Sequence, residues 1–312
     1  MKRYRVCGLT VASDIDLSTA ASELRLNDAE ADVRIRRSAV PTGLAEPIKT
    51  GPTWQRTEHQ ILITVPGVAR FLMSAGRELA FEPESGQSDA DLLIFLIGSA
   101  FGALLHQRGA LVLHAGAVAV NGEAVLFCGP SGSGKSSLVA ALSATGYPLI
   151  TDDVCIVQDN ADGVPVISPD GRRLKLWADT IEGLSLNCVP SDAVRAGIQK
   201  YWVHPPTPPL ENAVRLRAIY FLRAEEPPHS AGIEPLGRLE AVALLRNNAY
   251  RPQLVKILDQ EATWMSRSLA IMPVGRAFYL TRKIGFDALP SCIGSLESHW
   301  RHMEAEQVRT RA

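Results

Sequence analysis

The sequence is poor in the features that mark metal scaffolds, secreted proteins and nucleic-acid binders. Its 312 residues hold five cysteines, at positions 7, 128, 155, 188 and 292, and no two of them form a Cys-x-x-Cys pair. The scatter and the odd count argue against a zinc ribbon and a disulfide framework, and they favour a reducing compartment. Lys plus Arg total 32 and Asp plus Glu total 33, so the net charge of −1 offers no excess of positive charge for binding nucleic acid.

Long apolar runs are also lacking. The first residues, Met1–Tyr4, lead into no apolar stretch, which predicts that there is no signal peptide. The most apolar segment, Leu92–Leu105, is about 14 residues long, whereas a membrane-spanning helix needs roughly 20. We therefore expect a cytoplasmic protein without a membrane partner. Apolar residues still make up 46% of the chain, which is enough to bury a sizeable core.

The length of the chain and a change in its residue pattern predict two domains. Residues 1–88 read as strands and turns, with Arg5–Val11 as one strand, and we expect a β-rich accessory domain there. Near Ser88 the pattern changes to a helix that is apolar on nearly every side, so we expect residues 89–312 to form an α/β catalytic domain. Further helices are expected over Arg251–Ser268 and at the C-terminal end of this domain.

A glycine-rich motif carries the clearest functional signal. It matches the phosphate-binding pattern G-x-x-x-x-G-K-[S/T] at every fixed position, and it lies between a strand-like run and a helical pattern that begins at Ser137. Glycines let backbone N–H groups surround a phosphate, Lys135 reaches the β- and γ-phosphates, and the Ser136 hydroxyl binds Mg²⁺. We predict that ATP and Mg²⁺ bind through Ser137 and the motif itself, which reads Gly129, Pro130, Ser131, Gly132, Ser133, Gly134, Lys135, Ser136.

Two adjacent carboxylates follow the motif at the end of an apolar run. They are Asp152 and Asp153, and the short separation from Lys135 predicts one helix, one turn and a strand that returns directly beside the loop. One carboxylate suffices as a metal ligand. The other is then free to act as a general base on an incoming hydroxyl.

A histidine is predicted at the same place from strand register. Asn121-Gly122 between two apolar runs is a strong signal for a two-residue hairpin turn. If Val120 faces Glu123, then stepping back along the two strands brings His114 opposite Gly129, which opens the glycine-rich loop. We therefore expect His114 at the rim of the nucleotide site, within reach of a phosphate or of the two carboxylates.

Phosphoryl transfer gains from further cations around the γ-phosphate. Of several Lys and Arg residues, we rank Lys175 and Lys200 first. Lys175 stands between Leu174 and Leu176, so in a strand its side chain points away from those two. Arg251 belongs to the same group of candidates.

The run around His114, the glycine-rich motif and the Asp152-Asp153 pair together resemble the catalytic domain of HPr kinase/phosphorylase, over roughly residues 110–157. The resemblance implies a P-loop kinase core of the type shared with phosphoenolpyruvate carboxykinase. It also implies that Asp152 is the catalytic base, that Asp153 binds the metal with Ser136, that Lys135 and His114 act in catalysis, and that the protein forms homo-oligomers.

The whole-chain pattern is more similar to the HPr-kinase-related proteins of peptide biosynthetic clusters. The chain carries Ser137 where HPr kinases have Glu, it has a Leu-Lys-Leu-Trp segment at 174–177, and it has an Asn-x-Tyr-Arg run at 248–251. Some of these relatives phosphorylate the C-terminal Ser of a lasso peptide precursor. The resemblance thus implies a role in lasso peptide biosynthesis, with a peptide hydroxyl as acceptor.

The sequence favours an ATP- and Mg²⁺-dependent serine kinase that acts on a protein or peptide. Two alternatives stay open. One is a nucleotide-sensing binding module without phosphotransfer, in which the carboxylates only hold Mg²⁺, and the other is a small-molecule kinase.

Overall fold

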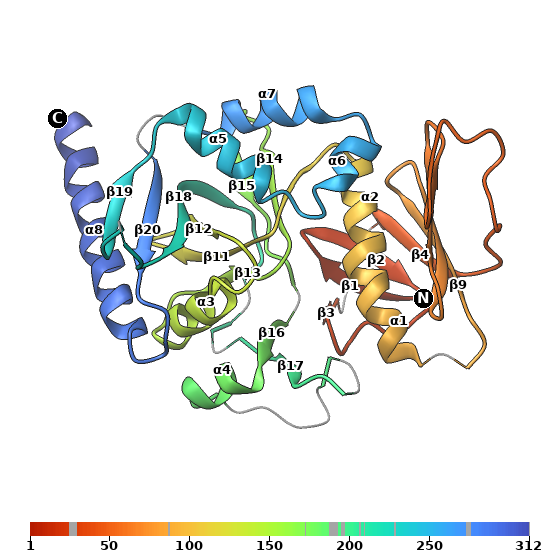
Figure 1. Ribbon diagram of the computed structural model, residues 1–312, viewed down its shortest axis with the longest axis horizontal. Helices are drawn as coiled ribbons and strands as arrows, with labels where there is room; N and C mark the ends of the chain where they lie inside the picture. The colour runs from red at the N-terminus through yellow and green to blue at the C-terminus, as the bar shows by residue number, and fades with distance from the viewer. Residues whose placement is uncertain are drawn as a thin grey trace.

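The computed structural model describes residues 1–24, 30–86, 88–171, 173–186, 193–194, 197–205, 207–208, 210–227, 229–272 and 276–311. In this part of the chain the fold is mixed α/β, with two nine-stranded sheets and a small two-stranded one. Figure 1 shows the first sheet on the right and the second on the left, with the helical segment of α1 (Asp89–Phe95) and α2 (Phe101–Gln107) running in front of the first sheet. No helix among the described residues has the length and apolar character needed to cross a bilayer.

The first sheet is built from the N-terminal strands in the order β3-β1-β2-β4-β9-β8-β7-β6-β5. Its strands are β1 (Lys2–Val6), β2 (Leu9–Ser13), β3 (Ser22–Glu23), β4 (Val33–Arg37), β5 (Lys49–Gly51), β6 (Trp54–Arg56), β7 (Gln60–Val65), β8 (Ala69–Ser74) and β9 (Glu78–Pro83). The β-rich character expected of residues 1–88 is therefore present.

The single strand predicted over Arg5–Val11 is wrong, because the chain turns back in the middle of it. Cys7 and Gly8 have φ values of 51° and 77°, and they join β1 to β2 as an antiparallel hairpin in which Val6 faces Leu9. Two successive left-handed residues are what a tight hairpin turn with the native strand twist requires. The sequence did not reveal this turn because its first residue is Cys7, whereas Asn, Asp or Gly is the usual residue at that position.

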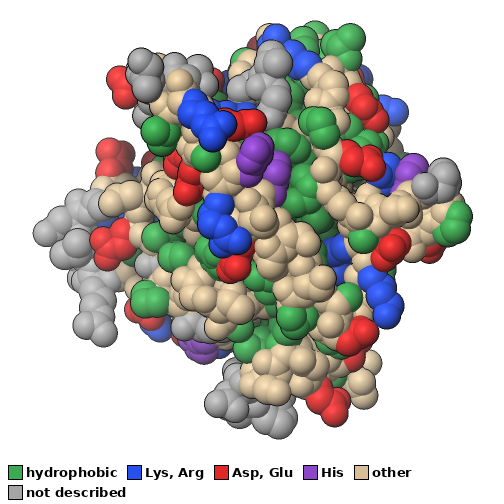
Figure 2. All heavy atoms as spheres, turned by 90° about the vertical axis from the view of Figure 1, so that its left-hand side faces the viewer, with side chains coloured by type: hydrophobic (Ala, Val, Ile, Leu, Met, Phe, Trp, Pro, Cys, Tyr) green, Lys and Arg blue, Asp and Glu red, His purple; other side chains and the backbone are tan. Residues whose placement is uncertain are grey.

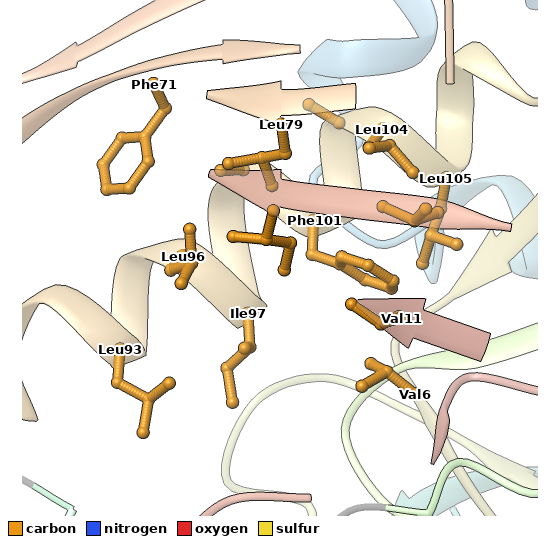
Figure 3. Close-up of a cluster of buried hydrophobic side chains, with 14 of the residues drawn as sticks. Val6, Val11, Phe71, Leu79, Leu93, Leu96, Ile97, Phe101, Leu104 and Leu105 are labelled. Atoms are coloured by element: carbon orange, nitrogen blue, oxygen red, sulfur yellow. The ribbon is translucent and has the colours of Figure 1, made fainter. Parts of the chain in front are cut away.

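A long helical segment follows the first sheet and packs against it. It comprises α1 (Asp89–Phe95), a π-helical turn η1 (Leu96–Ala100) and α2 (Phe101–Gln107). Ser88 caps its start, since the Ser88 side chain accepts a hydrogen bond from the Asp91 backbone N–H. Its buried side chains share one core with side chains of the first sheet (Figure 3), including Leu93, Leu96, Ile97, Phe101, Leu104 and Leu105 on the helix and Val6, Val11, Phe71 and Leu79 on the strands.

This packing bears on the division of the chain. The helix after residue 88 belongs by its buried contacts to the core of the first sheet, and that core continues into Val112 and Ile156 of the second sheet. The division into domains at residues 88 and 89 stays a prediction. What the structure adds is that the helical segment packs on the first sheet and also contacts β10 of the second sheet.

The second sheet contains the strands around the glycine-rich motif. Its central order is β10-β14-β15-β18-β12-β11-β13, with β20 paired to β18 and β19 paired to β20. The strands are β10 (Leu111–Leu113), β11 (Ala115–Val120), β12 (Glu123–Cys128), β13 (Leu149–Thr151), β14 (Cys155–Asp159), β15 (Pro165–Ile167), β18 (Val214–Ala224), β19 (Gly232–Pro235) and β20 (Ala277–Arg282). Because β12, β18 and β20 are parallel, their carboxyl ends meet at one edge of the sheet.

The hairpin between β11 and β12 has the predicted register. Val120 faces Glu123 and the pairing runs back to Ala115 opposite Cys128. Asn121 and Gly122 both have positive φ, at 51° and 77°. The strand β13, however, pairs with β11 and not with β12. The end of β13 nevertheless lies beside the glycine-rich loop, as expected, since the Ser136 hydroxyl donates to Asp152 Oδ1 at 2.9 Å.

Helices cover both faces of the second sheet. On one face, α3 (Lys135–Ala144) and α8 (Leu289–Arg311) bury apolar side chains against it, and on the other face α5 (Arg238–Asn247) and α7 (Glu261–Ile271) do the same. Short α4 (Ala178–Gly183) directly follows β16 (Leu174–Trp177), which pairs with β17 (Lys200–Val203) in the two-stranded sheet. On the face formed by α8, acidic and basic side chains lie interspersed (Figure 2).

The helix predicted over Arg251–Ser268 is interrupted. The chain forms α6 (Gln253–Ile257), then turns at Asp259, whose φ is 55°, and continues as α7. Lys49 and Arg56 of the first sheet both form ion pairs with Asp259. A left-handed residue ends a helix, and these ion pairs hold the break against the neighbouring sheet.

The shared core predicts how much stability is lost when a buried side chain of the helical segment is shortened. Leu104 of α2 is fully buried, so Leu104→Ala should lower the free energy of unfolding by about 2–5 kcal/mol. The same change at Leu239 of α5, which is 78% exposed, should alter it by about 0.5 kcal/mol or less. Urea denaturation of both variants measures the difference. Equal midpoints would contradict this account of the core.

Candidate functional site

The glycine-rich motif forms a tight loop between β12 and α3. Gly132 and Gly134 have φ values of 83° and 80°, and the Ser133 N–H donates to the Pro130 carbonyl at 3.2 Å. No side chain caps the start of α3. The backbone N–H groups of its first turn therefore lack intrahelical partners, and with the helix dipole they favour an anion at this end.

Lys135 lies folded over the loop at the first position of α3. Its ammonium donates hydrogen bonds to the carbonyls of Gly129, at 2.7 Å, and Pro130, at 3.0 Å. Burial lowers the pKa of this lysine. A buried cation whose hydrogen bonds go to neutral carbonyls gains from an anion close by, because two opposite charges interact strongly where water is excluded.

Ser136 and Asp152 meet beside the loop. The Ser136 hydroxyl donates to Asp152 Oδ1 at 2.9 Å, and the other oxygen of this carboxylate, Oδ2, is buried without a hydrogen-bond partner among the described residues. Burial first, and the neighbouring charge of Asp153 second, raise the pKa of Asp152. Such an oxygen has an unsatisfied capacity for a proton or a cation.

The same pair of oxygen donors suits Mg²⁺. This ion is held by one or two carboxylates together with substrate phosphates and water, so it does not need a complete cage of protein ligands. The described residues contain no group of three or more His, Cys, Asp and Glu that would form such a cage. Ser136 and Asp152, next to a loop built for an anion, therefore fit a metal that arrives with a phosphate.

Asp153 has a different set of neighbours. It adopts a φ of 80°, and its carboxylate lies 3.1 Å from His114 Nδ1 and 3.3 Å from Lys175 Nζ. His114 Nδ1 is also 3.0 Å from the Asp153 carbonyl oxygen. His114 occupies the break between β10 and β11, where the predicted register ends. The histidine and the second carboxylate are thus side by side.

The two lysines come from the two-stranded sheet. Lys175 in β16 and Lys200 in β17 lie 4.9 Å and 5.3 Å from the ring centres of Trp202 and Trp177 respectively. Leu174 and Leu176 are buried, and Lys175 points the other way, as its place in the strand predicted. Both lysines line the same cavity as the residues of the glycine-rich loop.

One cavity of about 370 Å³ gathers most of the candidate residues. We call it the loop cavity, and the candidates that line it are His114, Ser131, Gly132, Gly134, Lys135, Ser136, Ser137, Asp152, Asp153, Lys175 and Lys200. Gly129 and Pro130 line a neighbouring cavity instead, and the Ser133 hydroxyl is buried without a partner among the described residues.

The structure pairs the two carboxylates differently from the assignment that the resemblance implies. That assignment joins Ser136 to Asp153 as metal ligands and leaves Asp152 as the base. In the structure the Ser136 hydroxyl bonds Asp152, while Asp153 contacts His114 and Lys175. Adjacent residues at a strand end point in different directions, and the spacing of the residues in the sequence does not say which of them faces the helix.

Sequence reasoning missed Arg282 at the end of β20. This buried side chain donates to the Ser133 carbonyl at 2.9 Å, and it lies so close to Gly134 that a Cβ there would collide with its guanidinium. Burial lowers its pKa. The signal that could have found it is its place at the carboxyl end of a parallel strand, the edge at which the loop also lies.

Asn248 was quoted in a motif but given no role. Its side-chain oxygen accepts a hydrogen bond from the Gly129 N–H at 2.7 Å, and its backbone carbonyl accepts one from the His114 N–H at 2.8 Å. One residue thus holds the start of the loop and the histidine at a fixed separation.

Comparison with known proteins gives limited information. No family model matches the chain, and no curated protein matches it. A solved structure of the Hpr(Ser) kinase/phosphatase from Coxiella burnetii is similar over 64% of this chain and 96% of that chain, with 15% sequence identity and a TM-score of 0.34. A similarity of this size assigns neither an activity nor a substrate.

The raised pKa of Asp152 predicts a pH-dependent stability. A carboxyl whose pKa is higher in the folded state destabilises that state as the pH rises above the ordinary value of 3.8. Asp152→Asn should therefore increase the free energy of unfolding, and the gain should grow from about pH 4 to about pH 7. Urea denaturation across this range measures it, and a gain that does not change with pH would contradict the burial argument.

A control of opposite sign is available at Asp16. Hydrogen bonds from Ser18, and then from Lys2, lower the pKa of this carboxyl. Asp16→Asn should therefore decrease the free energy of unfolding at neutral pH, and the loss should shrink as the pH falls through and below 3.8.

Proposed function

We propose that the protein is an ATP- and Mg²⁺-dependent kinase that transfers the γ-phosphoryl group to a Ser hydroxyl of a protein or peptide. The observation that carries the proposal is the convergence of two carboxylates with different neighbours on one glycine-rich loop. Asp152 is bonded to the Ser136 hydroxyl, and Asp153 is bonded to an imidazole and an ammonium. Phosphoryl transfer needs both a metal-binding oxygen set and a group that receives the hydroxyl proton.

The loop and the cations around it bind the nucleotide. The N–H groups at the start of α3, together with Lys135, bind the phosphates. Arg282 fixes the loop through the Ser133 carbonyl. Ser136 and the unpartnered Oδ2 of Asp152 would hold Mg²⁺, which, when bound, neutralises charge on the phosphates.

Asp153 is the better candidate for the base. The resemblance gives that role to Asp152, so the proposal reverses the roles of the two carboxylates. Asp152 is 7% exposed and lines only the loop cavity, whereas Asp153 also lines the larger cavity next to it. Asp153 accepts the proton of the acceptor hydroxyl as that oxygen bonds to the γ-phosphorus. The bond between this phosphorus and the bridging oxygen breaks, and ADP leaves. Lys175 and His114 orient the carboxylate.

The acceptor implied by the resemblance is the C-terminal Ser of a lasso peptide precursor. The cavity beside Asp153, about 920 Å³, lies near the upper end of the range for ligand pockets and so has room for a short peptide segment.

Incubation with Mg²⁺·ATP and Ser-containing peptides, read by mass spectrometry, tests the proposal. Asp153→Asn should lower the transfer rate by about 10²–10⁴-fold while ATP binding persists, because only the proton acceptor is lost. Asp152→Asn should instead weaken the Mg²⁺ dependence of ATP binding. Asp162→Asn, at an exposed turn away from the site, is the matched control and should change neither.

Two results would count against a peptide kinase, and a third would count only against the assignment of the base. Peptides that gain no phosphoryl group, while ATP binds, would favour a nucleotide-sensing module. Transfer to a metabolite alone would favour a small-molecule kinase. A full rate in Asp153→Asn with a lost rate in Asp152→Asn would return the base to Asp152.

A further inference from the structure

A second cavity lies against the loop cavity and shares one wall with it. The shared wall is formed by His114, Ser131, Asp153, Lys175 and Lys200. The second cavity is the larger one, at about 920 Å³ against about 370 Å³. Since the proposed base stands in the shared wall, a group bound in the larger cavity can present an atom to Asp153 without entering the nucleotide side.

Part of the lining of this cavity is apolar and comes from two separate parts of the fold, next to the polar side chains of Asn247, Asn248 and Gln253. Ile94 and Gly98 belong to the helical segment that packs on the first sheet, and Leu244 and Tyr250 come from α5 and the segment after it. Gly98 lies in the π-helical turn η1, a feature that recurs at functional sites. The cavity is therefore suited to a ligand with apolar side chains.

The position of Tyr250 is fixed by its backbone and by a glycine. The Tyr250 N–H donates to the Val112 carbonyl at 2.9 Å, and the His106 ring nitrogen lies 2.8 Å from the Tyr250 carbonyl. A Cβ on Gly102 would come within 2.6 Å of the Tyr250 ring, so only glycine admits the ring at this place. The apolar part of the lining is thus built in before any ligand binds.

The charge on the lining is unbalanced. Asp153 is the one acidic residue among the described residues that line the larger cavity, and it is bonded to His114 and Lys175. Two further cations, Lys200 and Arg251, line the same space. An anionic group on the ligand would offset this excess of positive charge.

Arg251 is the cation best placed to select that anion. It is exposed, its guanidinium lies 5.7 Å from the ring centre of Tyr250, and it makes no ion pair with the described residues. Its φ of 51° is in the left-handed region, which is unfavourable for a residue other than Gly, Asn or Asp. A strained backbone at a residue whose guanidinium lies in a cavity without an ion-pair partner indicates a functional role and not a packing role.

We propose that the larger cavity, here named the acceptor cavity, binds the acceptor as a peptide segment with apolar side chains and a carboxylate beside the Ser hydroxyl, and that Arg251 pairs with this carboxylate. The inference rests on the proposed kinase function and adds the chemistry of its acceptor. An Arg–carboxylate pair can form two parallel hydrogen bonds, which would hold the neighbouring hydroxyl at a set distance from Asp153.

Three synthetic peptides test the proposal and separate the two sources of a carboxylate. All carry apolar residues before one Ser. The first ends in that Ser with a free carboxylate, the second continues with Asp and is amidated, and the third continues with Asn and is amidated. Binding is measured by fluorescence anisotropy of labelled peptides with Mg²⁺·ADP present, and transfer is measured from Mg²⁺·ATP.

The wild-type protein should bind the first peptide, the second, or both, about 10- to 100-fold more tightly than the third. The variant of choice is Arg251→Asn, because Asn tolerates the left-handed backbone and removes the charge. It should raise KM for the carboxylate peptide about 10- to 100-fold, leave KM for ATP unchanged, and abolish the preference over the third peptide. Arg251→Lys should restore part of the preference.

The control is Arg215→Ala, at the opposite end of β18 from the loop, which should leave every constant unchanged. Equal binding of all three peptides to the wild type, or an unchanged preference in Arg251→Asn, would overturn the acceptor assignment. Because binding is read without transfer, selective binding with no phosphorylation would overturn the kinase function alone. If all three peptides bound equally well and were phosphorylated at the same rate, the kinase function would stand and the role of the acceptor cavity would be overturned.

Discussion

The site depends on the hairpin that turns at Asn121-Gly122. Its register pairs Ala115 with Cys128, so the next residues beyond this pair are His114 and Gly129. A slip of one residue would turn every side chain of a strand to the opposite face of the sheet. Parallel pairing of β12, β18 and β20 then brings Arg282 to the same edge, while β13, on the other side of β11, delivers the two carboxylates. The chemistry at this edge therefore follows from backbone pairing.

Local signals in the sequence predicted much of this arrangement. The Asn-Gly turn, the glycine-rich motif and the alternation around Lys175 each depend on neighbours in the chain, and the structure has the hairpin, the loop and the strand where they were expected. The turn at Cys7-Gly8 and the break at Asp259 were missed, because non-glycine residues adopt positive φ there under tertiary contacts. The roles of Arg282 and Asn248 were missed for a related reason, since each acts on residues more than a hundred positions away.

The helical segment α1–α2 gives the first sheet a part in the proposed activity. It packs on that sheet, contacts the second sheet, and supplies Ile94 and Gly98 to the acceptor cavity. A ligand in this cavity would touch both halves of the chain. In the proposed function, the residues that would recognise the acceptor line the larger cavity, those that would hold the phosphates line the loop cavity, and Asp153 lies in the wall between the two.

The central claim is that the loop before α3 binds the phosphates of ATP with Lys135 as its cation. Titration calorimetry of ATP into the wild type and into Lys135→Ala, with Mg²⁺ and with a chelator, tests it most directly. The account predicts that ATP binds the wild type, more tightly with Mg²⁺ than with chelator, and that Lys135→Ala loses most of this affinity. Equal affinity of the two proteins for ATP would contradict it.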